Sequence, residues 1–143
     1  MFPRLASVLL AILLPGIAGP ALAEGYLAQK PEALADLVLG LGDAGYGVSQ
    51  KDYALNTGKA YRLKIKSTGQ KPCPWEAPDF VNFIWLRKIE VNKVEIKASH
   101  VYEIEMEREG EAEVFFVPIR PGAYVWRCRG LEDKGMSGKF IVK

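Results

Sequence analysis

Histidine is almost missing from this sequence of 143 residues, since His100 is the only one. A metal centre that needs several imidazoles therefore has too few of them here, and a Ser-His-Asp hydrolase would have to use His100. The G-x-S-x-G turn that exposes the nucleophile of many hydrolases is also missing. The composition leaves a two-carboxylate glycosidase open, but one short β domain has little room for a substrate cleft. We expect no enzymatic activity.

An excess of charge of one sign is missing as well. Lysine and arginine number 19, against 17 aspartates and glutamates. A nucleic-acid or anionic-membrane partner needs a strong basic excess, so neither is expected.

Long apolar runs are confined to the N-terminus. Arg4 precedes LASVLLAILLPGIAG, and the small residues of ALA end at Ala23. This order of charge, apolar run and small residues is typical of a secretory signal peptide, residues 1–23. The alternative is an N-terminal membrane anchor, although Pro15 interrupts an already short run. We expect a periplasmic or secreted protein that starts at Glu24 and does not insert into the membrane after cleavage.

Cysteine is scarce, and both copies, Cys73 and Cys128, lie in the exported part. Export brings them into an oxidising compartment, where a pair of cysteines forms a disulfide unless a metal holds it reduced.

Residues 24–50 are predicted to hold one short helix and a linker before the main domain, residues 51–143. In Lys30–Leu39, Pro31 suits a first helical turn and Gly40 a stop, so we expect a helix that covers the core. GLGDAG, residues 40–45, has the spacing of a dinucleotide-binding loop, but it leads into a predicted strand and not into a helix. We interpret it as a linker.

The main domain is predicted to be all β. Apolar residues expected to face the core alternate with charged ones in several segments. They are Tyr61, Leu63 and Ile65; Val94 and Ile96; Tyr102, Ile104 and Met106; and Tyr124, Trp126 and Cys128. EVFFVPI is a denser apolar run, as in a strand covered on both faces. Short strands separated by turns with Gly and Pro indicate a β-sandwich or a barrel.

Glutamates alternate along residues 103–113. We interpret them as the solvated face of a hairpin opposite Lys64 and Lys66. A docking patch for a partner is the alternative.

The C-terminal segment PIRPGAYVWRCRGLEDKGMSGKFIVK resembles the last two strands of a cupredoxin of the plastocyanin and azurin type. The shared features are a Pro-Gly turn, a Tyr-x-aromatic-x-Cys strand, a Cys-to-Met loop and a final strand. The resemblance implies a Greek-key β-sandwich and a copper cofactor held by cysteine, methionine and two histidines.

Carried over by position, the resemblance gives an atypical copper site. Cys128 takes the thiolate position and Met136 the thioether position, but Leu131 stands where the loop histidine would be. Cys73 is the residue nearest to the position of the first histidine. His100 is a possible additional ligand, though a surface histidine is the simpler interpretation. The resemblance also implies that Cys73 and Cys128 are neighbours, with their Cα atoms within about 7 Å.

Three functions are open at this point. Sulfur ligands favour Cu(I), so the first is a protein that holds or passes Cu(I) through Cys73, Cys128 and Met136 to a redox or copper-transfer protein partner. The second is a copper-free interaction module with a Cys73–Cys128 disulfide. Blue-copper electron transfer is the third, and the missing histidines make it the weakest.

Overall fold

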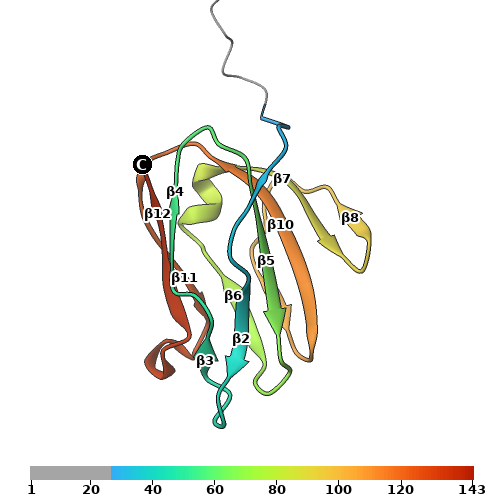
Figure 1. Cartoon of the computed structure of the whole chain (residues 1–143), viewed down its shortest axis with the longest axis vertical. Helices are drawn as coiled ribbons and strands as arrows, with labels where there is room; N and C mark the ends of the chain where they lie inside the picture. Colours follow the sequence, from blue (N-terminus) through green and yellow to red (C-terminus); the bar gives the residue numbers. More distant parts are fainter. Residues whose placement is uncertain (1–26) are drawn as a thin grey trace, which may run out of the picture.

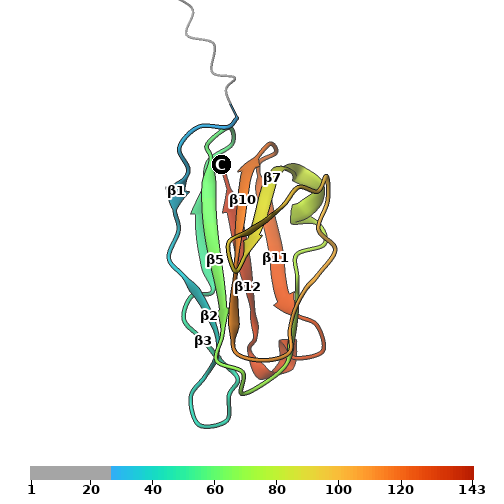
Figure 2. The same cartoon turned by 90° about the vertical axis from the view of Figure 1, so that its right-hand side faces the viewer.

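A computed structural model describes residues 27–143 and shows two β-sheets packed face to face (Figures 1 and 2). The predicted all-β sandwich is confirmed. The predicted signal peptide, residues 1–23, lies outside the described residues. Among residues 27–143, no helix has the length and apolarity needed to cross a membrane.

The larger sheet has seven strands. They are β1 (Glu32–Ala33), β2 (Leu37–Leu41), β3 (Gly47–Val48), β5 (Tyr61–Ser67), β7 (Ile84–Val91), β8 (Val94–Ile96) and β10 (Gly110–Pro118). Their hydrogen-bonded order is β3-β2-β5-β10-β7-β8, and β1 also pairs with β5. Both β1 and β2 run parallel to β5, whereas β10 runs antiparallel to it.

The smaller sheet has five strands and carries both cysteines. They are β4 (Asp52–Leu55), β6 (Cys73–Glu76), β9 (Ile104–Met106), β11 (Gly122–Cys128) and β12 (Ser137–Val142). Their order is β4-β12-β11-β6-β9. Two 3-10 turns, η1 (Phe80–Phe83) and η2 (Glu132–Lys134), lie in the connections.

Aromatic rings fill the space between the sheets. Phe80 stacks on Phe140 with ring centroids 4.2 Å apart and meets Phe116 edge-on at 5.4 Å. Tyr61 and Trp126 are fully buried beside them, as their alternating patterns predicted. Each such ring buries a large apolar surface, so this cluster contributes strongly to the stability of the fold.

The predicted helix at Lys30–Leu39 is wrong. The segment is extended and forms β1 and β2 against β5, with Leu37 and Leu39 fully buried at alternate positions. A ten-residue helix is marginal on its own, whereas these strands gain backbone hydrogen bonds from the edge of β5. Asp36 adds an ion pair with Lys66 at 2.6 Å. The alternation of leucines in LVLGL was the signal for a strand.

One of the predicted core segments and part of a second face solvent. Val94 and Ile96 lie on β8, an edge strand that extends away from the sandwich in Figure 1, and Val94 is 60% exposed. Tyr102 precedes β9 and is 66% exposed, while Met106 of the same segment is buried as predicted. Alternation identified the extended chain of β8, but this edge strand has no second sheet to cover it, and Tyr102 lies in the connection before β9.

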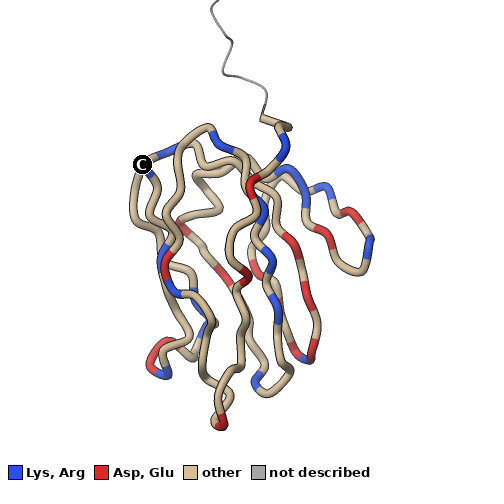
Figure 3. The backbone as a smooth tube through the Cα atoms, in the orientation of Figure 1, with Lys and Arg blue, Asp and Glu red and all other residues tan. Residues whose placement is uncertain are grey.

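The glutamates of β10 face basic residues of β5, and Figure 3 shows acidic and basic positions along these neighbouring strands. Glu113 lies 3.0 Å from Lys64 and 3.3 Å from Arg62, and Glu111 lies 3.4 Å from Lys64. The pairing with Lys64 is confirmed, whereas Lys66 pairs with Asp36. Glu113, as the main hydrogen-bond partner, raises the pKa of Lys64.

Candidate functional site

The two cysteines lie at the ends of neighbouring strands. Cys73 begins β6 and Cys128 ends β11, and these strands pair antiparallel with Cys128 opposite Trp75. On the other side of β6, Cys73 is opposite Met106 of β9. The smaller sheet itself therefore brings together cysteines that are 55 residues apart in the chain.

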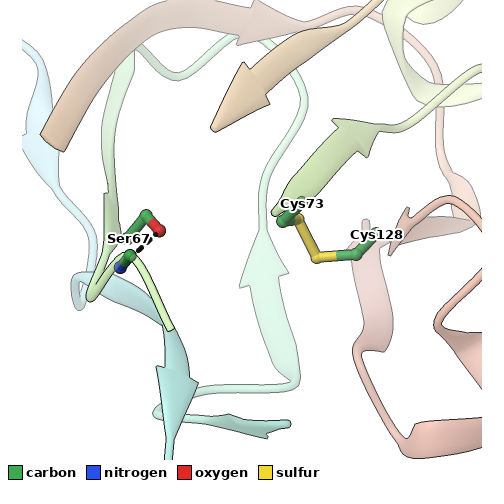
Figure 4. The surroundings of a disulfide bond; sticks show 4 residues. Ser67, Cys73 and Cys128 are labelled. Atoms are coloured by element: carbon green, nitrogen blue, oxygen red, sulfur yellow. Dashed lines mark hydrogen bonds between the residues drawn. A yellow bond between two sulfur atoms is a disulfide. The ribbon is translucent and has the colours of Figure 1, made fainter. Parts of the chain in front are cut away.

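Cys73 and Cys128 form a disulfide, which Figure 4 shows bridging the two strands. Their Cα atoms are 5.0 Å apart, within the predicted 7 Å. Both residues are fully buried. In the turn before β6, the Ser67 hydroxyl accepts a hydrogen bond from the backbone N–H of Gly69 at 3.0 Å (Figure 4).

The loop from Cys128 to Met136 closes on itself. The backbone N–H of Cys128 donates to the carbonyl of Met136 at 2.9 Å, and the N–H of Leu131 donates back to the carbonyl of Cys128 at 2.9 Å. Gly135 completes η2 with a φ of 89°, a conformation that favours glycine. The backbone of Met136 is thus hydrogen-bonded to that of Cys128, and the Met136 side chain is fully buried. Leu131 packs partly buried against the core.

His100 differs from the three sulfur residues in its exposure to solvent. It is exposed and lies in the connection between β8 and β9, whereas Cys73, Cys128 and Met136 are fully buried. Within residues 27–143, no group of three or more histidines, cysteines and carboxylates is placed to hold a metal ion. Of the predicted ligands, the two cysteines and Met136 meet at one end of the smaller sheet, through β6, β11 and the loop after β11.

Ion pairs flank the disulfide on both sides. Glu76, only 3% exposed, accepts from Arg127 at 2.7 Å, and Glu132 of η2 lies 3.4 Å from the same guanidinium. On the other side, Arg129 reaches Glu103 at 2.7 Å. Sequence reasoning missed these pairs, because the residues are scattered along the chain and only the register of β6 on β11 places Glu76 opposite Arg127.

Two tryptophans pack near the disulfide in different ways. Trp126 donates its indole N–H to the carbonyl of Lys51 at 2.8 Å. Trp75 is also buried, but its indole N–H has no hydrogen-bond partner among residues 27–143. Both tryptophans belong to the core.

The donor chemistry depends on the redox state of the cysteines. A cysteine binds a metal as its thiolate, and two sulfurs bonded to each other are not thiolates. In the disulfide form only the Met136 thioether remains, which does not fit a copper ion held by several sulfurs. Reduction would release two thiolates, and thiolates together with a thioether are a set of soft donors that fits Cu(I).

Comparison with known proteins identifies structures of similar fold but no family for this chain. No protein-family model matches the sequence, and no curated protein matches it. Among solved structures, the multicopper oxidase of Campylobacter jejuni has a TM-score of 0.54 at 16% identity, covering 81% of this chain and 31% of that one. McoA multicopper oxidase of Aquifex aeolicus has a TM-score of 0.57 at 12% identity, and the match covers 80% of this chain and 30% of that one. Auracyanin B has a TM-score of 0.51 at 14% identity, and the match covers 80% of this chain and 91% of that one.

The fold is cupredoxin-like. The chain spans about a third of the length of the multicopper oxidases and about nine-tenths of auracyanin B. The resemblance seen in the C-terminal motif is thus confirmed at the level of fold. At these identities the similarity carries no ligand set and no activity to this chain.

Proposed function

We propose that the protein is an exported, non-catalytic interaction module in which a disulfide stands where a cupredoxin holds its metal. The observation that carries this proposal is the bond between Cys73 and Cys128. It joins the two sulfurs that the resemblance assigned to a metal, and both are fully buried. With its cystine formed, this end of the sandwich is a rigid scaffold whose exposed loops are free to contact another protein.

Cu(I) binding by the reduced protein is the second candidate. It is favoured by the position of Met136, whose carbonyl accepts the hydrogen bond from Cys128 and whose side chain is fully buried. In this alternative, Cys73, Cys128 and Met136 hold Cu(I), and the copper passes to a protein partner. The metal and the disulfide compete for the same sulfurs, so only a reducing partner makes the site available.

A thiol and copper count on the mature protein separates the two candidates. The protein is isolated from the periplasm without reductant, denatured, and assayed for free thiols and for bound copper. We expect no free thiol and far less than one copper per chain. Two free thiols with one copper per chain would overturn the interaction module and favour the Cu(I) carrier. An intact mass starting at Glu24 tests export in the same sample, and a mass that includes residues 1–23 would contradict it.

Two further measurements complete the test. Cross-linking of the oxidised protein in the periplasm should join it to a reproducible partner, and cross-links only within the chain would contradict the interaction role. Cu(II) added to the reduced protein should give no intense blue band, because Leu131 occupies the loop position of a histidine. A strong thiolate-to-copper band would instead support electron transfer, with His100 as the first ligand to replace.

A further inference from the structure

An open pocket of about 500 Å³ lies against the Cys128–Met136 loop. Its lining includes Lys134 and Gly135 of that loop and residues of the turn between β2 and β3, which carries Tyr46. Lys51, just before β4, completes the lining. This turn includes the GLGDAG segment, which follows a strand but opens a hairpin and not a helix, so it is not a dinucleotide loop.

Positive charge gathers around one aromatic ring in this pocket. The ammonium groups of Lys71 and Lys134 lie 5.0 Å and 5.9 Å from the centre of the Tyr46 ring. Within residues 27–143, neither of these lysines nor Lys51 forms an ion pair. The lysines of the large sheet differ, since Lys64 and others are matched by carboxylates. The charge at the pocket is therefore available to a ligand.

The pocket walls are fixed by contacts with the scaffold. Gly45 has a φ of +72°, and a Cβ there would lie 2.9 Å from Cβ of Gln70, so the turn packs tightly on the β5–β6 connection. The Thr68 hydroxyl adds a hydrogen bond to the carbonyl of Gly40 at 2.8 Å. A Cβ on Gly135 would lie 3.6 Å from Nζ of Lys51, which places that ammonium over the Cys128–Met136 loop. A pocket held in this way loses little conformational freedom on binding.

The lining favours a ligand that carries both a negative charge and an apolar group. Asp43 is the one carboxylate of the lining, against the two ammonium groups of Lys51 and Lys134. Leu41 and Val48 supply an apolar wall next to Tyr46. Acidic side chains that alternate with aliphatic ones on a protein segment match this pattern of charge and apolar surface.

We propose that this pocket docks an acidic segment of a partner protein, a proposal that rests on the role as an interaction module. A carboxylate of the segment lies between Lys51 and Lys134, and a neighbouring aliphatic side chain packs on Tyr46 and Leu41. Because the pocket shares the Cys128–Met136 loop with the disulfide, docking takes place at the end of the fold where a metal was expected.

The test is a titration of the oxidised mature protein, followed by backbone amide NMR, with a capped peptide of alternating Glu and Leu. Amide shifts should concentrate at residues 42–47, Lys51 and 134–135. The double variant Lys51→Gln/Lys134→Gln should bind about tenfold more weakly, the effect of roughly one charge-assisted contact. The variant Asp43→Asn should bind more tightly, since it removes the repelling carboxylate. Unchanged thermal unfolding of the variants confirms that they are folded.

Matched controls decide whether the recognition is specific. Lys93→Gln removes an exposed charge from the β7–β8 turn and should leave the affinity unchanged. A weakening as large as that of the double variant would overturn the pocket in favour of general attraction, and equal binding of a Gln-for-Glu peptide would overturn it too. Equal or tighter binding of free glutarate at the same amides would overturn the partner segment and assign a small organic acid.

Different experimental outcomes would contradict the docking pocket and the role as an interaction module. If the partner still cross-links fully to the double variant, the pocket is wrong and the module stands. If the peptide binds at the pocket but periplasmic cross-linking finds no partner, the docking of a partner segment and the module both fail, and only an anion site remains.

Discussion

Arg127 holds the buried carboxylate of Glu76 through two nitrogens, since its Nε and Nη2 both lie 2.7 Å from Oε1. These residues are register partners on β11 and β6, next to the disulfide. Glu132 of η2 lies 3.4 Å from the same Nε, so one guanidinium joins the sheet to the Cys128–Met136 loop. Glu76 is the main cause of the raised pKa of Arg127. This arrangement satisfies a carboxylate that has almost no access to water.

Replacing Arg127 by methionine should therefore destabilise the protein. The change leaves the charge of Glu76 buried without its partner, and the expected loss is about 2 kcal/mol, because Arg127 is itself partly exposed. Urea unfolding measures the loss. Lys59→Met is the matched control: Lys59 pairs with exposed Glu32 at the surface, so water screens the pair and the loss of stability should be much smaller than that of Arg127→Met. Equal effects of the two changes would contradict a structural role for the buried pair.

Reduction of the disulfide should lower stability without opening the fold. The bond closes a loop of 55 residues, which in the chain-entropy model stabilises the folded chain by about 4 kcal/mol. Urea unfolding with and without dithiothreitol measures the difference. The double variant Cys73→Ala/Cys128→Ala should match the reduced protein and not respond to dithiothreitol. A parent protein that is equally stable in both conditions would show that its cysteines are not bonded to each other.

The sequence predicted those parts of the fold in which local pattern and global position agree. Tyr61, Leu63 and Ile65 alternate on a central strand with a sheet on one face, so their pattern translates directly into burial. Val94 and Ile96 have the same pattern on an edge hairpin, where no second sheet covers them. Alternation reveals an extended chain and not what lies above it.

The candidate site was only partly predictable. The proximity of Cys73 and Cys128 came from the resemblance of the C-terminal motif, because no local pattern links residues 55 apart. The cations around Tyr46 come from three different connections, which only the folded sheets bring together. Such convergence leaves no periodic signal along the chain.

The β7–β8 hairpin should show a carboxyl group with a low pKa. Lys88, and after it Lys97, lower the pKa of Glu95 to about 2. The folded value lies below the value of about 4.3 for an unfolded chain. The stabilising contribution of Glu95 is therefore complete above pH of about 4.3 and is lost as the pH falls towards 2.

Carboxyl NMR during an acid titration measures this pKa directly. The midpoint of Glu95 should lie near 2 and rise towards its ordinary value in Lys88→Met, whose ammonium lies 2.6 Å from the Glu95 carboxylate. Lys97→Met removes the second cause and should produce a smaller rise. A midpoint near 4 in the parent protein would contradict the pairing.

Among the glycines of residues 27–143, Gly138 should be the least tolerant of a side chain. A Cβ at this position of β12 would collide with the carbonyl oxygen of Lys51, which accepts hydrogen bonds from Trp126 and from the N–H of Lys139. Gly138→Ala must therefore push the start of β4 away from the sheet and break these bonds. We expect a loss of about 3 kcal/mol in urea unfolding, from overpacking together with an unsatisfied indole N–H. Gly110→Ala is the control, because nothing lies within 4 Å of a Cβ there, and its effect should stay within about 0.5 kcal/mol. Similar stabilities of the two variants would show that β4 does not approach β12 this closely in solution.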